Sequence, residues 1–344
     1  MIVQVCPPGP GGVRDYADCL ARGWALRGVD TRLVEGAAET LQARLEELIG
    51  RGAGGRLCVV LHFSGYGYAA RGLCGWIGEV LARLKQDRGD DLRLVVVFHE
   101  LFATGMPWRS AFWLAPWQTR AARRLARLAD SLWTNTAHHA AWLRETTGGA
   151  MPLQVHPVFS NVGEPVESLA WEQRAPRIVV FGAAATRLRA FTALRALAPA
   201  LARLGIQEIL EAGAGSSQSR AASALPSRHL GRLPAAELGP LLAASRFGLL
   251  DYPARYLGKS GVFAAYAAHG CTVVNTFALD VDADGLHAGV DYLNLRLPFE
   301  PDAALLAQMA LRLQRWYGGH SLVLQSRELL RAANGERPPV AATA

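Results

Sequence analysis

The segment 247–276 constrains the fold of this chain most, because it contains a strand, a loop, a helix and a second strand in close succession. Apolar residues at 247–250 and 271–274 flank a helix predicted over 262–269, which Gly270 ends. Neighbouring parallel strands need a long crossover connection, and that connection is usually a helix. The segment therefore predicts one unit of a parallel α/β sheet.

The sequence Gly-Lys-Ser-Gly at 258–261 stands where this helix begins. A helix N-terminus presents unpaired N–H groups and a partial positive charge, to which Lys259 adds a full one. Gly258 and Gly261 let a ligand approach the backbone closely, and Ser260 can cap the helix or donate to an oxygen. We predict a phosphate or diphosphate site here.

The same residues allow two other interpretations. A P-loop needs a glycine five residues before Gly258, and Pro253 occupies that position, which excludes an ATPase. The remaining alternative makes Lys259 a solvated surface lysine and Ser260 a simple N-cap.

Strands and helices keep alternating before and after this segment, which predicts doubly wound α/β sheets. A chain of 344 residues is too long for one ordinary core, so two domains are expected. The predicted parts are an N-terminal domain at 1–160, a linker at 161–176, a C-terminal domain at 177–318, a helix at 319–334 that can cross back to the first domain, and a disordered tail at 335–344.

The formal net charge of +7 favours an anionic partner, such as a nucleotide or a phospholipid surface. No nucleic-acid-binding motif occurs, so no nucleic acid partner is predicted. The five cysteines form no C-x-x-C pair, which predicts buried, reduced thiols in the cytoplasm. Neither a signal peptide nor an apolar run of about 18–20 residues is present, and a peripheral contact with the inner face of a membrane stays open.

Three unusual groups of residues follow predicted strands of the first domain: Gly11-Gly12, His62, and His99-Glu100. Ligands of doubly wound sheets bind at the carboxyl ends of the strands, which makes His99 and Glu100 the candidate catalytic residues. A plain turn at the glycines and hydrogen-bonded structural histidines are the alternatives. His138 and His139 point in different directions around a helix, so no metal site is predicted.

The segment 102–127 combines aromatic residues in its first part with arginines in its second. An exposed segment of this kind would contact a membrane or a lipid-linked acceptor, with the arginines near phosphates. The alternative is a core helix with a basic outer face.

Arg187 and Arg189 lie near the start of a helix predicted over 188–204, directly after a strand that ends in Gly182. Cations at a helix N-terminus oppose the helix dipole, and a bound anion would offset that cost. We therefore expect an anion near these arginines, with solvated arginines as the alternative.

Several motifs together resemble a GT-B glycosyltransferase of the family 4 type. The motifs are Gly11-Gly12-Val13, the segment 130–135 that opens a strand, the segment 158–163 at the domain hinge, the run 229–246, and the stretch 252–270.

The resemblance implies two Rossmann-like doubly wound domains that face each other across a cleft. It also implies a glycosyltransferase that moves a sugar from a nucleotide-diphosphate-sugar to a hydroxyl of a saccharide or lipid-linked acceptor, in polysaccharide or glycoconjugate assembly of the bacterial type. The donor is a substrate, and neither a cofactor nor a metal is expected. The candidate donor-binding residues are Gly11, Gly12, Gly182, Arg187, Arg189, Tyr256, Gly258, Lys259, Ser260 and Gly261.

The sequence departs from the family pattern at two places. Leu257 and Ala265 occupy the positions of a glutamate pair at the sugar-nucleotide site, and Ala183 stands where a phosphate-binding arginine is expected, which Arg187 or Arg189 would replace. Two alternatives therefore stay open, a non-catalytic GT-B protein that binds carbohydrate or a partner and a nucleotide-sugar epimerase. The choice between a retaining and an inverting reaction is also open.

Overall fold

The computed structural model describes residues 1–51, 56–196, 199, 201, 203–217, 225–278, 282–298, 300 and 302–336. The chain forms two compact units, and each is described by itself. Unit 1 consists of Met1–His156 together with Leu322–Ala344, and unit 2 consists of Pro157–Ser321. Of the tail predicted to be disordered, all but residues 335 and 336 lies outside the described residues.

Unit 1 contains a six-stranded parallel sheet in the order β2-β1-β3-β4-β5-β6. Its strands are β1 (Ile2–Cys6), β2 (Thr31–Glu35), β3 (Leu57–Phe63), β4 (Leu92–Phe98), β5 (Ser131–Thr134) and β6 (Leu153–Val155). Its helices are α1 (Gly12–Ala25), α2 (Leu41–Arg51), α3 (Gly65–Tyr68), η1 (Ala70–Gly72), α4 (Gly75–Arg88), η2 (Gly89–Asp91), α5 (Ser110–Leu128), α6 (Ala137–Thr147) and α12 (Leu322–Asn334). The apolar runs of β3 and β4 are buried throughout, as expected for strands covered on both faces.

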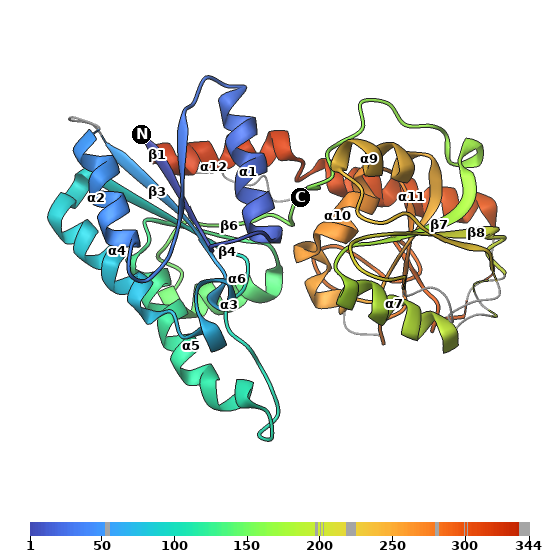
Figure 1. The fold of residues 1–344 in the computed structure, drawn as a ribbon, viewed down its shortest axis with the longest axis horizontal. Helices are drawn as coiled ribbons and strands as arrows, with labels where there is room; N and C mark the ends of the chain where they lie inside the picture. Colours follow the sequence, from blue (N-terminus) through green and yellow to red (C-terminus); the bar gives the residue numbers. More distant parts are fainter. Residues whose placement is uncertain are drawn as a thin grey trace. The chain divides into compact units, whose positions relative to one another are not determined.

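The two faces of this sheet carry different helices (Figure 1). Alternate strand residues, such as Val59 and Val96, form one core with α2, α4, α5 and α6. The other face is covered by α1 and α12, which are far apart in the sequence but pack against each other. Tyr16 Oη donates to Gln325 Oε1 at 2.7 Å, and Trp24 Nε1 donates to the carbonyl of Ser326 at 2.7 Å. The C-terminal helix thus completes the core of unit 1.

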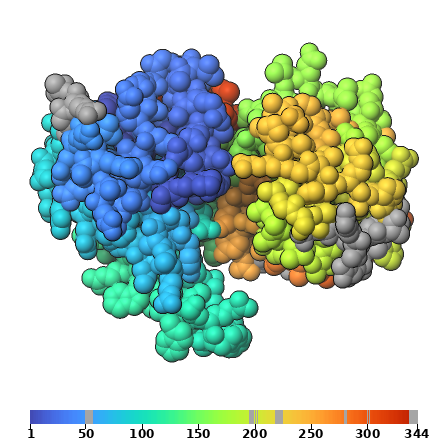
Figure 2. Space-filling model, viewed as in Figure 1, coloured from blue at the N-terminus to red at the C-terminus, as the bar shows by residue number. Residues whose placement is uncertain are grey.

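Helix α5 differs between its two halves. Its second half packs on the sheet through small and apolar residues such as Ala122 and Leu125, with arginines on the outer surface. Its first half, together with the loop that follows β4, projects from the rest of unit 1 (Figures 1 and 2). Aromatic side chains of this part, such as Trp108 and Trp113, are exposed. Within the described residues, no helix is both long and apolar enough to span a bilayer.

Unit 2 contains a second six-stranded parallel sheet, in the order β12-β11-β10-β7-β8-β9. Its strands are β7 (Ala175–Phe181), β8 (Glu208–Ala212), β9 (Ser227–His229), β10 (Ser245–Leu250), β11 (Thr272–Asn275) and β12 (Leu293–Asn294). Its helices are η3 (Trp171–Gln173), α7 (Ala184–Ala196), α9 (Ala235–Ala243), η4 (Ala254–Lys259), α10 (Gly261–Ala268) and α11 (Ala303–Gly318). The fold class expected from the alternation of strands and helices is confirmed.

The segment 161–176, expected as a linker, is built into unit 2. Trp171 is buried in the core of this unit, and its indole N–H donates to Thr272 Oγ1 at 2.9 Å. The Arg174 guanidinium donates to the carbonyls of His269 and Gly270. The turn residues of this segment suggested a linker, but one large apolar side chain and one arginine attach it to the core.

All five cysteines are buried and free, as predicted. Burial raises the pKa of the Cys271 thiol to about 12 and that of the Cys74 thiol to about 11. These thiols are therefore protonated at neutral pH and fill the core as small apolar groups.

Candidate active site

Each sheet has one place where the strand order reverses direction. In unit 1 this point lies between β1 and β3, and in unit 2 it lies between β7 and β10. Connections from the two neighbouring strands leave in opposite directions there, so their carboxyl ends border a crevice where ligands of such sheets bind. The predicted site residues fall at these two edges, one set in each unit.

At the edge of unit 1, two histidines are buried side by side. His62 lies in β3 and His99 follows β4, and the His62 Nδ1 and His99 Nε2 atoms are 3.2 Å apart. The Tyr16 ring of α1 contacts both imidazoles edge-on. Burial lowers the pKa of His62 well below its usual value, and the neighbouring His99 lowers it further. His62 is therefore neutral at physiological pH.

The hydrogen bonds around His62 determine its tautomer. Gln4 Nε2 donates to the carbonyl of Ala17 at 3.2 Å, so the amide oxygen of Gln4 faces His62 Nε2 at 2.9 Å. An amide oxygen can only accept, so His62 Nε2 carries the proton and its Nδ1 is an acceptor. His99 Nε2–H must then donate to His62 Nδ1.

Glu100 directly follows His99 in the sequence and is only partly buried. Its carboxylate accepts a hydrogen bond from Ser64 Oγ at 2.9 Å. The backbone N–H groups of His99 and Glu100 both approach the carbonyl of Phe63. The ends of β3 and β4 therefore bring an imidazole and a carboxylate to one edge, as the sequence predicted.

Gly11 and Gly12 form the start of α1 at the same edge. Both are exposed, and a Cβ atom added to either would meet nothing within 4 Å. No side chain caps this helix. The N-terminus of α1 is thus accessible to an anion, although the glycines are not required here by close packing.

At the edge of unit 2, the N-terminus of α10 adjoins the loop after β7. Ser260 Oγ caps the helix by accepting from the N–H of Phe263 at 3.2 Å. The Val262 side chain lies 3.4 Å from the position that a Cβ of Gly182 would take, and Gly182 has φ +119. Asn161 Oδ1 lies 3.7 Å from the position of a Gly261 Cβ. The first turn of α10 contains no acidic residue, so nothing on that turn offsets the positive end of the helix dipole.

Lys259 and Tyr256 lie on the turn that leads into this helix. They belong to η4, and the Lys259 ammonium is 5.2 Å from the centre of the Tyr256 ring. Both side chains are half-buried. Gly258 is buried, and its carbonyl accepts from the N–H of Val158 at 2.7 Å. Lys259, Ser260 and Gly261 thus place a cation and a capped helix N-terminus together, while Gly258 serves the fold of the turn.

The expected contact of Arg187 with an anion does not fit the geometry. Its side chain is fully buried and forms an ion pair with Glu211 at 2.8 Å. Its remaining donors bind the carbonyls of Gly182 at 2.6 Å and Ala214 at 2.8 Å. A Cβ at Gly213 would collide with the Arg187 guanidinium, so a glycine is needed there. Arg187 therefore joins the loops that follow β7 and β8.

Arg189 lies on the exposed side of α7 and can reach a ligand in solvent. Leu257 and Ala265, which occupy the glutamate positions of the family pattern, are both buried apolar side chains. Neither position can therefore offer a carboxylate to a ligand.

Sequence reasoning missed most of the partners that hold these residues. Gln4, Tyr16 and Gln325 carry the polar network around His62, and Glu211 pairs with Arg187. A glutamine or a glutamate inside an apolar strand was the available signal for two of them, because buried polar groups need partners. Among the described residues, no group of three or more His, Cys, Asp or Glu side chains could hold a metal ion.

No protein-family model and no curated protein matches the sequence. Solved structures are similar over nearly the whole chain. An alpha-glucosyltransferase in complex with UDP matches with a TM-score of 0.59 at 11% identity, covering 97% of this chain and 98% of that one. The trehalose-6-phosphate enzyme from E. coli bound with UDP-2-fluoro glucose matches with a TM-score of 0.60 at 10% identity, covering 98% of this chain and 100% of that one.

The chain has the GT-B fold. A third structure, a GtfA/B complex, matches with a TM-score of 0.53 at 14% identity, covering 87% of this chain and 60% of that one. The expectation of a GT-B architecture is thus confirmed at the level of the fold. At identities of 10–14%, the similarity concerns only the arrangement of strands and helices. The chemistry of the site depends on the residues of this chain.

Proposed function

We propose that the protein is a glycosyltransferase that moves a sugar from a nucleotide-diphosphate-sugar to a hydroxyl acceptor. The observation that carries this proposal is the N-terminus of α10, where Ser260 caps the helix, Lys259 adds a charge and Gly182 borders the first turn. This combination of dipole, cation and small residues suits a diphosphate. UDP and UDP-sugars bound to structures of the same fold support the choice of donor.

The chemistry of unit 2 follows from the charge that develops during transfer. When the bond between the sugar and the diphosphate breaks, negative charge accumulates on the departing phosphate oxygens. Lys259 and the N–H groups at the start of α10 would stabilise that charge, and they are already oriented for it. Arg189 is exposed and is a further cation that could contact the phosphates of a bound donor.

The chemistry of unit 1 concerns the acceptor. Glu100 is partly exposed and can accept the proton of an attacking hydroxyl. His99, the residue before Glu100, is the alternative base. We propose a saccharide or a lipid-linked saccharide as the acceptor, in the assembly of a polysaccharide or glycoconjugate.

A donor screen is the first test. Thermal shifts are measured with UDP-, GDP- and ADP-sugars, and the cognate donor at about 100 times its dissociation constant should add roughly 2.7 kcal/mol of stability. Lys259→Ala should reduce the shift and Lys259→Arg should keep most of it. If no nucleotide sugar shifts the transition, the proposal fails.

A turnover assay then separates transfer from its two rivals. With the selected donor and a panel of saccharide acceptors, we expect release of nucleoside diphosphate that depends on the acceptor and falls about 100-fold in Lys259→Ala. Conversion of donor without an acceptor would indicate an epimerase. Binding without turnover over the whole panel would indicate a non-catalytic protein.

We also propose that transfer needs no divalent metal ion, because Lys259 and the α10 N-terminus can supply the positive charge. Turnover should be unchanged after treatment with EDTA. Loss of activity that Mg²⁺ or Mn²⁺ restores would contradict this.

A further inference from the structure

The loop that leads into α5 and the first half of α5 together expose an unusual amount of apolar surface. Their large side chains, between 42% and 76% exposed, are Met106, Trp108, Phe112, Trp113 and Trp117. Single exposed hydrophobic residues are common on protein surfaces, but a contiguous group of tryptophans normally marks an interaction site. We call this group, residues 106–117, the aromatic arm.

The helix continues from the aromatic arm into a basic surface. The segment 101–128 contains five arginines and no Asp or Glu. Four of these arginines, Arg120, Arg123, Arg124 and Arg127, are exposed and line a surface depression of ≈ 600 Å³. Glu79 on α4 approaches Arg124 at 3.4 Å, and both are about half exposed, which is a weak pair. The partner of this surface is therefore an anion.

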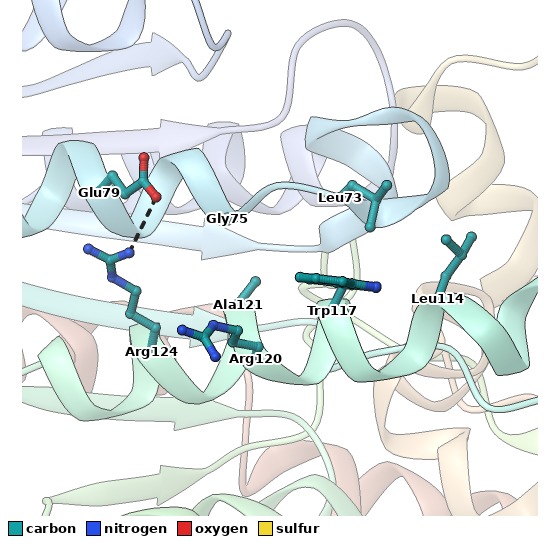
Figure 3. A pocket seen from close by; sticks show the side chains of 8 residues that line it. All are labelled: Leu73, Gly75, Glu79, Leu114, Trp117, Arg120, Ala121 and Arg124. Carbon is teal, nitrogen blue, oxygen red and sulfur yellow. Dashed lines mark hydrogen bonds and ion pairs between the residues drawn. The ribbon is translucent and has the colours of Figure 1, made fainter.

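A pocket of ≈ 390 Å³ lies where the aromatic arm meets the basic surface, between α4 and α5. Figure 3 shows that Leu73, Leu114 and Trp117 line one end of it, and that Arg120, Arg124 and Glu79 line the other, which leaves that end with a net positive charge. An apolar end next to a cationic end is complementary to an amphiphile with a phosphate headgroup.

The arm is fixed to the body of unit 1 through one buried side chain. Gln118 Oε1 accepts from the N–H of Ala103 at 2.8 Å, and its Nε2 donates to the carbonyl of Arg71 at 2.6 Å and to Tyr66 Oη at 3.2 Å. Trp113 Nε1 also donates to the carbonyl of Pro107 at 2.9 Å, which closes the turn before the helix. Hydrogen bonds thus fix the base of the arm to unit 1 and the Trp113 ring to the turn before the helix.

We propose that the aromatic arm and the basic surface dock unit 1 on an anionic phospholipid membrane. The tryptophans enter the interfacial layer, where an indole combines an apolar body with one polar group, and the arginines contact lipid phosphates. The pocket takes one phospholipid, with the phosphate at Arg120 and Arg124 and the start of an acyl chain at Trp117.

A lipid surface is favoured over a nucleic acid because of the arm. Duplex DNA would satisfy the arginines, but it offers no apolar layer for the three exposed tryptophans of the aromatic arm. The docking surface belongs to unit 1 alone, and it does not depend on the proposed sugar transfer.

Flotation with lipid vesicles tests the proposal. Wild-type protein should float with phosphatidylcholine vesicles that contain phosphatidylglycerol, and much less with phosphatidylcholine alone. Arg120→Glu with Arg123→Glu should weaken binding about 25-fold or more, since each basic residue near an anionic surface contributes about fivefold. Trp108→Ser with Trp117→Ser should also weaken it, and brominated lipids should quench the tryptophan fluorescence of the wild type.

The matched control is Arg27→Glu with Arg44→Glu, which makes the same change in net charge at exposed positions elsewhere on unit 1. It should bind anionic vesicles within about twofold of the wild type, as expected for charges outside the contact surface. Equal loss in this control, or no binding of wild type to anionic vesicles, would overturn the proposal. The proposal would also be overturned if the wild type bound duplex DNA but not vesicles, and if Arg120→Glu with Arg123→Glu abolished DNA binding while the control variant did not. That result would assign the surface to nucleic acid.

Discussion

The two carboxyl edges are formed by sheets of similar topology, but they place different chemistry at the point where the strand order reverses. In unit 1 the edge holds the buried side chains of His62, His99 and Tyr16, of which His62 is kept neutral by burial, and the partly exposed carboxylate of Glu100. In unit 2 the edge holds Lys259 and a helix N-terminus. The first suits proton transfer, and the second suits a diphosphate. Similar topology therefore positions a site without determining what it binds.

The largest effect is expected where unit 2 buries a charge pair. Arg187→Ala would leave Glu211 fully buried without its ion pair, and should lower the free energy of unfolding by about 3–5 kcal/mol. Arg189→Ala, two residues along the same helix but exposed, should change it by less than about 0.5 kcal/mol. Urea unfolding of the two variants measures the difference. Similar stabilities would show that Arg187 does not hold the loops together.

The buried, neutral His62 should affect how the stability of the protein depends on pH. Burial lowers the pKa of His62, so below its unfolded value of about 6.5 the unfolded state binds a proton that the folded state does not. The contribution of His62 to the free energy of unfolding is therefore fully present above about pH 6.5 and is lost as the pH decreases below that value. His62→Asn should reduce that slope by up to about 1.4 kcal/mol per pH unit.

The control for this slope is His287, which is exposed and whose pKa is raised by its hydrogen bond to Asp282. Its contribution has the opposite sign, so His287→Asn should not flatten the acid slope. The pKa values of the buried His269 and the partly buried His156 are also lowered by desolvation, so part of the slope should remain in His62→Asn. An unchanged slope in that variant would contradict a neutral, buried His62.

The smallest effect compares one helix cap from each unit. Thr136 caps α6 in unit 1 and Ser260 caps α10 in unit 2, each by accepting an N–H at 3.2 Å. Thr136→Ala and Ser260→Ala should each cost about 1 kcal/mol of stability. Ser260→Ala alone should weaken donor binding, as seen by titration calorimetry. If both variants bind the donor like the wild type, Ser260 is only a cap.

The fold could be predicted well because the two patterns that indicate it, apolar runs for strands and amphipathic periodicity for helices, are both local in the sequence. Apolar runs such as 57–63 and 92–98, separated by amphipathic helices, specify buried parallel strands without knowledge of distant contacts. The short strand β9 was missed, since Ser227–His229 is exposed and has no apolar pattern.

The candidate site was less predictable because its geometry depends on contacts between distant residues. The position of Arg187 beside a glycine-ended strand suggested an anion site, but a buried Glu211 on the next strand takes up its charge. The tautomer of His62 depends on Gln4, which is 58 residues away in the sequence. The exposure of the aromatic arm could not be predicted from the spacing of its apolar residues, because a helix buried in a core shows the same spacing.

The central claim is that the α10 edge of unit 2 binds the donor and that the edge of unit 1 serves the acceptor. Titration calorimetry of the donor selected by the screen into wild type, Lys259→Ala and His99→Gln tests it most directly. We expect the dissociation constant to rise about tenfold or more in Lys259→Ala, as for the loss of a charge-assisted contact of about 1.5–3 kcal/mol, and to change less than about twofold in His99→Gln. Equal affinity of Lys259→Ala and wild type, or a greater loss in His99→Gln, would contradict the account.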